Sequence, residues 1–412
     1  MRVILKQNMF EEVQNTQNSL KFLVKLGQCL LLMPVTTSHN LYNFKWVSKK
    51  CIASIIMSVV SFFMLILFLN YFFHQPKKFA ATSGVVFYLT TFLFRIQFIC
   101  VAEKWPRLMK KWTEVDSIMQ PYLVIENFGV RIKVVSVLLF TLALGEHLFF
   151  TASLGIFTND LPWSDKLESY FKTIFQFIFM VFPYNIYFAV IVQIFNWSWT
   201  VIWNYVDVFI ISLCICFTYR LKQIESKINF LVKLRVRDVT YWKQTRENYN
   251  KLSELCSELE KSVSPLVLVS FADKFYTILY QLLGLLDGPE YGLEQDTRII
   301  SKLYYAFSFC YILLRFSAVI FFASAIDVKN KDIASKLFET PSEVYNFEIE
   351  RFIMHLKVSP PIITGAKIFQ IKKSLLLKVF QLFVKVVSDT VFLQIVSAII
   401  IYELVVIKFQ DY

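Results

Sequence analysis

The sequence is poor in charged residues, glycine and proline. Only 18% of its 412 residues are charged, 56% are hydrophobic, and the mean hydropathy is +0.52, whereas a soluble domain is about a quarter charged. These proportions argue against a soluble globular enzyme. Glycine and proline number 9 and 11, against 43 phenylalanines and 20 tyrosines, which excludes collagen-like, linker-like and disordered chains.

Signatures of catalysis and of metal binding are also missing. The sequence has no HExxH, Walker or GxSxG motif and no CxxC pair. Seven cysteines, several of them within apolar runs, make no disulfide framework. The four histidines are scattered along the chain, at His39, His74, His147 and His355. We therefore expect no enzymatic activity, no cofactor and no metal site.

Long apolar runs dominate instead. A helix needs about 20 apolar residues to cross roughly 30 Å of hydrocarbon. Such runs lie at 51–73, 79–102, 134–157, from about 183 past 217, at 262–286, at 303–325 and, at the end of the chain, at 395–409. They are continuous rather than alternating, which favours helices over barrel strands. The predicted fold is an all-α polytopic membrane protein with seven transmembrane helices.

Lysine and arginine predict the orientation of these helices. Segments 1–50, 103–133, 218–261 and 327–378 hold 7, 6, 10 and 9 basic residues, whereas each of the three connections between them holds two. Because cytoplasmic loops carry the basic excess, we expect a cytoplasmic N-terminus and an extracellular C-terminus. A G-protein-coupled receptor has seven helices in the opposite orientation. The inner-leaflet excess also explains the net charge of +12 without nucleic-acid binding.

The topology divides the chain into four predicted parts. They are a cytoplasmic N-terminal segment (1–50), a six-helix bundle with a cytoplasmic helical loop at 218–261 (51–325), a cytoplasmic segment (326–394) and the last helix with a short extracellular end (395–412). Apolar residues recur at helical spacing over 221–263 and 341–357. The second stretch places four on one stripe: Tyr345, Ile349, Phe352 and Leu356. These faces need a partner, which is either the same chain or another subunit.

Ionisable residues lie inside the apolar runs, where they are costly and usually face protein or water. They are Arg95, Glu146, His147, Asp273, Lys274 and Arg315. Two interpretations stay open. The residues form interhelical ion pairs, such as Glu146 with Arg315, or some of them line a polar ligand cavity.

Aromatic and amide residues gather in the predicted outer halves of three helices. They are Tyr184, Asn185 and Gln193 on the fourth helix, Tyr276, Tyr280 and Gln281 on the fifth, and Tyr304, Tyr305 and Tyr311 on the sixth. Rings cover the C–H faces of a polyol, while amides and carboxylates bind its hydroxyls. The alternative, above all for Tyr304 and Tyr305, is an aromatic belt at the membrane interface.

The chain resembles insect gustatory receptors of the sugar-sensing clade. The resemblance rests on the order and spacing of several short segments. These are GQCLLLMPV (27–35), AEKWPRLMKKWTEVD (102–116), TLALGEHL (141–148), IFNWSWTVIWNYVDVFI (194–210), SPLVLVSFA (264–272), PSEVYNFEIERF (341–352), ITGAKIF (363–369) and YELVVIKF (402–409).

The resemblance implies a sugar-gated cation channel in the plasma membrane of a chemosensory neuron. Its last helices would line a central pore in a homo- or hetero-tetramer of related subunits. Each subunit would hold an outward-facing sugar pocket, and segment 326–394 would belong to a cytoplasmic anchor. For the pocket we predict Glu146, His147, Tyr184, Asn185, Gln193, Tyr276, Gln281, Tyr311 and Arg315, with Arg315 holding Glu146 in place. Membrane lipid is a further partner.

The last helix departs from the family pattern of Thr-Tyr, five residues and Gln-Phe. Ile401 replaces the threonine and Lys408 replaces the glutamine. We predict that Ile401, Val405 and Lys408 line the pore, where four lysines would form a cationic ring that repels cations. Either the lysine snorkels away or the pore is altered. A non-conducting partner subunit is therefore one alternative function. A multi-pass transporter is a separate alternative, from another class of membrane protein.

The stretch between Ile363 and Tyr402 is about fifteen residues longer than the family pattern, roughly 22 Å if it is helical. The extra residues lie near 379–393. They either extend the last helix below the membrane or come from a faulty gene model.

Overall fold

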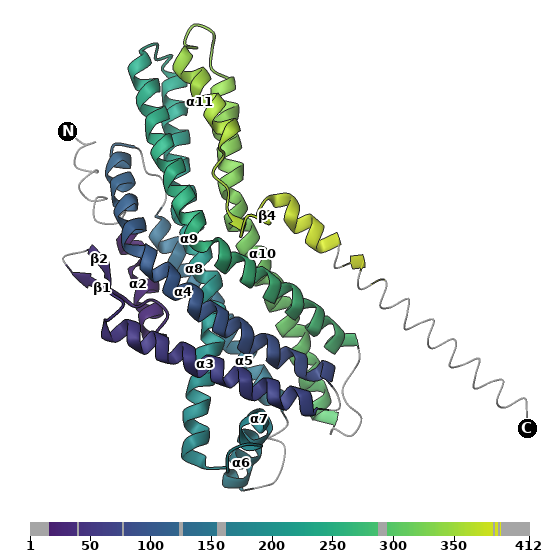
Figure 1. Ribbon diagram of the computed structural model, residues 1–412. Coiled ribbons are helices and arrows are strands. Elements are labelled where there is room, and N and C mark those ends of the chain that lie inside the picture. Colours follow the sequence, from purple (N-terminus) through teal and green to yellow (C-terminus); the bar gives the residue numbers. More distant parts are fainter. Residues whose placement is uncertain are drawn as a thin grey trace, which may run out of the picture.

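The structure is a computed structural model that describes residues 16–38, 41–75, 78–122, 127–154, 162–286 and 295–381, together with 384, 385 and 388. Its long helices form one elongated bundle (Figure 1). The predicted seventh span and most of the extra segment at 379–393 lie outside these residues.

Six helices of the described chain are long and apolar enough to cross a membrane. They are α3 (Lys49–His74), α4 (Lys78–Met119), α5 (Phe128–Ser153), α8 (Ile186–Lys233), α9 (Val239–Leu286) and α10 (Gln295–Phe338). Each coincides with one of the first six predicted runs, although α5 ends at Ser153 and α8 begins at Ile186, a few residues inside the predicted limits. The six predicted spans are therefore confirmed. Between α5 and α8 lie two short helices, α6 (Trp163–Ile174) and α7 (Gln176–Phe179). They account for the apolar residues that precede the fourth span.

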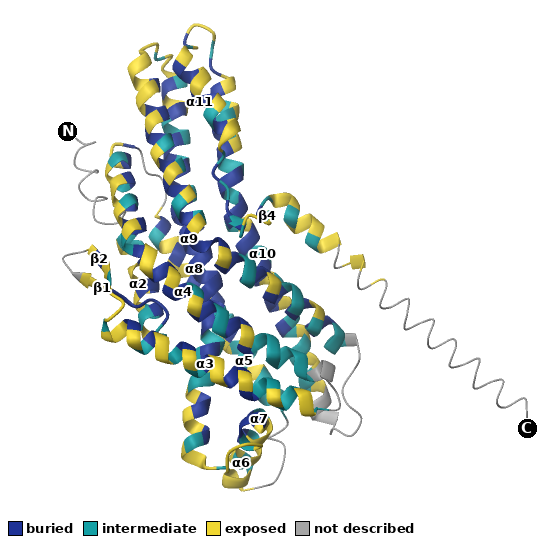
Figure 2. Ribbon diagram, in the orientation of Figure 1, coloured by how far each residue is buried: buried dark blue, intermediate teal, exposed yellow. Residues whose placement is uncertain are grey.

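Helix α8 is the centre of the bundle. In its most apolar stretch 83% of the residues are buried, against 33% in α3 and 28% in α5. It contacts α4, α5, α9 and α10 and is mostly dark blue in Figure 2, whereas the outer helices carry yellow, exposed positions. Those positions on α3 and α5 are apolar, as in Ile56, Val59 and Val137. This is the composition expected of helix faces that contact hydrocarbon.

Four of the described helices, α4, α8, α9 and α10, continue far beyond one membrane thickness. At 1.5 Å per residue, the 48 residues of α8 and of α9 extend about 72 Å. A short turn at 234–238 joins them, with Arg235 in a left-handed conformation (φ 46°). The predicted helices over 221–263 are therefore confirmed as the extension of α8 and the returning start of α9.

The apolar stripe predicted over 341–357 is covered by the chain itself. Helix α11 (Phe347–Val358) contacts α9 and α10, and it buries Ile349, Phe352 and Leu356. The Phe352 ring lies 5.0 Å from that of Tyr249 on α9. Tyr345 was wrongly placed on this stripe, because it precedes the helix and is 45% exposed. A small hairpin follows, formed by β3 (Thr364–Gly365) and β4 (Phe369–Gln370).

The N-terminal part of the described chain packs into the bundle rather than beside it. Helix α2 (Thr16–Cys29) contacts α4, α5 and α8, and a hairpin of β1 (Val35–Ser38) and β2 (Leu41–Phe44) follows it. Gly27 allows the close approach to α8, because a Cβ atom there would collide with the hydroxyl of Tyr205. That hydroxyl donates to the Leu23 carbonyl at 3.0 Å.

Buried polar contacts fix both ends of α2. At its start, Asp116 of α4 accepts from the Thr16 amide (2.9 Å), the Thr16 hydroxyl (2.9 Å) and the Arg220 guanidinium of α8 (2.8 Å). Just after its end, fully buried Arg95 donates to the Leu30 carbonyl at 3.4 Å. A cation at a helix C-terminus is electrostatically favourable, so Arg95 serves α2 rather than a ligand cavity.

Candidate functional site

The described helices enclose a cavity of about 630 Å³ between α3, α4, α5, α7, α8, α9 and α10. It reaches Gln75 and Leu154, the residues that cap the ends of α3 and α5. It therefore lies at the end of the bundle where the connections from α3 to α4 and from α5 to α6 are found. Aromatic side chains make up much of its wall, among them Phe68, Tyr88, Trp203, Tyr276, Tyr304 and Tyr311.

Six of the nine predicted pocket residues line this cavity. They are Glu146, His147, Tyr276, Gln281, Tyr311 and Arg315. Tyr280, Tyr304 and Tyr305, for which an aromatic belt was the alternative, also line it. The three spans that contribute these residues thus converge on one space, although the sequence could only place each of them on its own helix.

The other three predicted residues lie elsewhere. Asn185 caps the N-terminus of α8, with its side-chain oxygen accepting from the amides of Tyr187 (2.9 Å) and Phe188 (3.3 Å). Tyr184 precedes the helix and lines a separate outer groove, where the Lys172 ammonium lies 5.2 Å from its ring centroid. Gln193 is buried outside the cavity, and its Oε1 atom has no hydrogen-bond partner in the described part of the chain. All three predictions assumed that the cavity extends further along the fourth helix.

Glu146 lies at the end of a short chain of hydrogen bonds whose donors are uncharged. The Gln281 amide donates to the Ser308 hydroxyl at 3.0 Å, and that hydroxyl donates to the Glu146 carboxylate at 3.0 Å. The predicted ion pair with Arg315 is wrong, because Arg315 pairs with a different carboxylate. Arg315 consequently does not hold Glu146 in place; Ser308 does.

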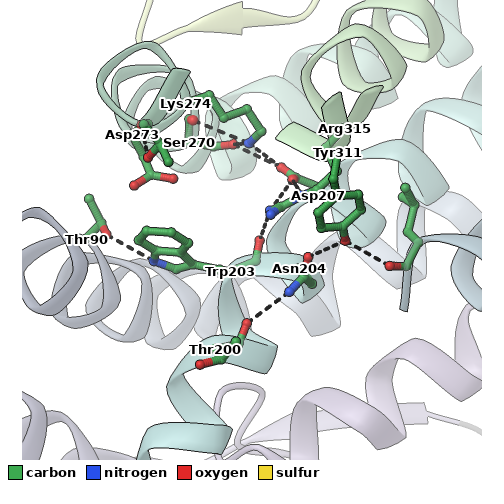
Figure 3. A network of polar contacts seen from close by, with 12 residues as sticks. Thr90, Thr200, Trp203, Asn204, Asp207, Ser270, Asp273, Lys274, Tyr311 and Arg315 are labelled. Carbon is green, nitrogen blue, oxygen red and sulfur yellow. Dashed lines mark hydrogen bonds and ion pairs between the residues drawn. The ribbon is translucent and has the colours of Figure 1, made fainter. Parts of the chain in front are cut away.

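The carboxylate that Arg315 binds is Asp207 on α8, which is fully buried (Figure 3). It accepts from Arg315 Nε at 2.8 Å and from a terminal Arg315 nitrogen at 2.6 Å. The Lys274 ammonium donates to its other oxygen at 2.5 Å. One aspartate thus joins α8, α9 and α10 through two cations. Interhelical ion pairs were correctly predicted, but the acidic partner of Arg315 is Asp207 and not Glu146.

Asp273 completes this group of charges. Its carboxylate lines the cavity and lies near Trp203 and Thr90 in Figure 3. Its Oδ1 atom is buried, and in the described part of the chain it has no hydrogen-bond partner. The Oε1 atom of Gln281 is likewise buried, and it too has no hydrogen-bond partner in the described part of the chain. A buried acceptor without a donor costs free energy, and these two atoms belong to residues that line the cavity.

Two predicted tyrosines use their hydroxyls within the protein. The Tyr311 hydroxyl lies 2.7 Å from Asn204 Oδ1 and 2.8 Å from the Leu139 carbonyl oxygen. The Tyr276 hydroxyl lies 2.5 Å from that of Thr82 on α4. These tyrosines can therefore offer their rings to a ligand, while their hydroxyls hold neighbouring helices.

Known proteins similar to this chain are chemosensory receptors. A family described as trehalose receptor matches residues 2–412. The gustatory receptor for sugar taste 64a of Drosophila melanogaster is 26% identical over 94% of this chain and 82% of its own length. The gustatory receptor 5a for trehalose of the same species is 27% identical over 82% and 71%.

The fold has been seen in a solved structure. The insect olfactory receptor OR5 from Machilis hrabei superimposes with a TM-score of 0.67 at 15% identity, over 90% of this chain and 96% of that one. A second structure of that receptor, in complex with eugenol, gives the same TM-score. The chain therefore belongs to the trehalose receptor family and is a multi-pass membrane receptor of the chemosensory type, not an enzyme.

Proposed function

We propose that the chain is a subunit of a sugar-gated cation channel and that sugar binds in the cavity between the helices. Two relatives named for sugar taste and for trehalose support the ligand class. The cavity volume of about 630 Å³ falls within the range of 300–1,000 Å³ typical of small-molecule sites.

The unpartnered acceptors of the cavity carry this proposal. Asp273 Oδ1 and Gln281 Oε1 lack donors in the described part of the chain, and every hydroxyl of a sugar can donate a hydrogen bond. Aromatic walls such as Trp203 and Tyr311 suit the C–H faces of a pyranose ring. A donor-rich ring with apolar faces therefore complements both features, whereas a purely apolar odorant would leave the acceptors unpaired.

The distribution of basic residues supports an extracellular entrance. The cavity reaches the ends of α3 and α5, and the connections that follow these helices hold only two basic residues each. By the positive-inside rule those connections face outward. Sugar would then enter from the medium that a taste neuron samples.

Opening requires that sugar discriminate between two states of the subunit. A ligand that binds both states equally shifts no equilibrium, and each tenfold preference for the open state contributes about 1.4 kcal/mol per site. We propose that a bound sugar strengthens the existing hydrogen-bonded link between Gln281 of α9, Ser308 of α10 and Glu146 of α5. The relative position of three helices would thereby depend on ligand.

Substituting Gln281 by leucine tests the binding site. The change removes an acceptor and breaks the link to Ser308, so we expect the half-maximal sugar concentration to rise at least about tenfold, equivalent to about 1.4 kcal/mol. The measurement is whole-cell current against sugar concentration in cells that express the chain. Gln193 offers a matched control, because it is the same residue type, 7% exposed against 6%, and lies outside the cavity. Equal effects of Gln193→Leu and Gln281→Leu would refute the assigned site.

The pore residues Ile401, Val405 and Lys408 lie outside the described residues. We propose that the last helices of four subunits, homomeric or mixed, surround the pore and that Lys408 weakens cation conduction. Lys408→Gln is then expected to increase sugar-evoked cation current several-fold at equal surface expression. An unchanged current would place Lys408 away from the pore axis.

A non-conducting partner subunit is the second candidate, favoured by the basic residue at position 408. Current from this chain alone, compared with its co-expression with a related receptor, separates the two functions. A conducting homomer gives sugar-evoked current alone, whereas a partner subunit changes only the response of the co-expressed chain.

A further inference from the structure

The charged side chains around the cavity do not balance. Asp207 and Asp273 offset Lys274 and Arg315, which leaves this group of four neutral. Glu146 is the remaining acidic residue of the wall. Its hydrogen bond comes from the neutral Ser308 hydroxyl, and in the described chain no ion pair reaches its carboxylate. His147 also lines the cavity, and with its imidazole neutral the cavity has one carboxyl group more than it has cations.

A carboxyl group at membrane depth without a cation is stable in only two ways. It keeps its proton, or it takes a cation from outside. The surroundings of Glu146 suit the second case, because Phe150 and Tyr304, whose ring centroids are 5.5 Å apart, line the cavity with it. Aromatic faces attract a desolvated ammonium group.

From this imbalance we infer that the preferred ligand is a sugar with one ammonium group, an amino sugar, whose ammonium binds the Glu146 carboxylate. The inference rests on the proposed function, since it assigns the hydroxyls of the same ligand to the acceptors of Gln281 and Asp273. If Glu146 is protonated in the empty cavity, its proton leaves to solvent as the ammonium enters. The net charge of the cavity then stays unchanged, so no further ion is needed.

Glu146 is favoured over Asp273 as the ammonium site because of their neighbours. Asp273 lies next to Lys274 in sequence, and it offsets the surplus positive charge that two cations leave on Asp207. An ammonium beside Asp273 would therefore add a positive charge to a group of side chains that is already neutral. Beside Glu146, the ammonium would neutralise a carboxylate that has no other cation among the described residues.

The test measures ligand-induced thermal stabilisation of the purified full chain, which does not depend on conduction. The probes are glucosamine, N-acetylglucosamine and glucose, at a pH of about 6.5, where ordinary amines are protonated. We expect an apparent affinity for glucosamine at least about tenfold higher than for either neutral sugar. Glu146→Gln should abolish this preference, so that glucosamine and glucose bind the variant with affinities within about threefold of each other.

Two further variants keep the result interpretable. Glu146→Asp retains the charge and should retain a preference for glucosamine, and Asp273→Asn should leave that preference in place. Equal affinities for the three probes in the unmodified chain would overturn the inference and leave the proposed sugar receptor intact. Binding of none of the probes would overturn both, and loss of the preference in Asp273→Asn alone would show that the ammonium binds elsewhere.

Discussion

Replacing Asp207 by asparagine is expected to remove most of the folded receptor from the cell surface. The change leaves Lys274 and Arg315, which are 3% and 6% exposed, without the carboxylate that both of them bind. Removing one partner of a buried ion pair typically costs about 3–5 kcal/mol. The measurement is surface expression together with the thermal unfolding temperature of the detergent-solubilised chain.

A second substitution shows whether charge imbalance is the cause. Lys274→Met alone leaves one acidic residue in excess, whereas Asp207→Asn with Lys274→Met leaves Arg315 with Asp273 and no excess. We therefore expect the double variant to be more stable than the sum of the two single effects predicts. Strict additivity would mean that the loss comes from packing rather than from unbalanced charge.

Replacing Arg220 by methionine is expected to detach helix α2 from the bundle. Arg220 is 3% exposed and donates to Asp116 at 2.8 Å and to Gln223 at 2.7 Å. Without it, Asp116 keeps only the two donors of Thr16, so a buried carboxylate loses its cation at a cost of about 3–5 kcal/mol. Limited proteolysis of the N-terminal part should become faster, and the unfolding temperature should fall.

Arg107 is the matched control for that experiment. It lies on α4 and pairs with an acidic residue of α9, Glu258, but its side chain is 72% exposed and the two are 3.5 Å apart. Exposed pairs contribute about 0–1 kcal/mol, so Arg107→Met should leave both measurements nearly unchanged. Similar effects of the two substitutions would contradict the role given to buried Arg220.

The spans could be predicted from the sequence because hydrophobic length alone determines them. The run at 51–73 needs no partner to be recognised, and α3 covers it with two further residues before it and one after. How far each helix continues beyond its apolar run was harder to predict from the sequence. Helix α4 extends to Met119, well past the apolar residues, because Trp105, Trp112 and Val115 on its polar extension are buried by neighbouring elements. That burial depends on tertiary contacts.

The candidate site could be predicted only in part, because its contacts also depend on how the helices pack. Glu146 and Arg315 stood out as charges within apolar runs, but their partners depend on how the helices rotate and shift against one another. Asp207 carried a signal, since it is the only charge between Ile174 and Phe217, yet periodicity on one helix cannot show that two cations from other helices meet it. Tyr184 and Asn185 were misplaced because α8 begins at Ile186.

The ion pairs of Asp207 with Lys274 and Arg315 form a three-helix tie between α8, α9 and α10. A tilt of the helices at this tie determines how far their distant ends move. From this tie, α8, α9 and α10 continue to Lys233, Val239 and Phe338, with Pro265 inside the α9 stretch, which at 1.5 Å per residue gives arms of between about 35 and 52 Å. A tilt of about 3° at the tie moves the far ends of such arms by about 2–3 Å, by this geometry alone. A displacement that is small at Asp207 is therefore larger at the far ends of these helices.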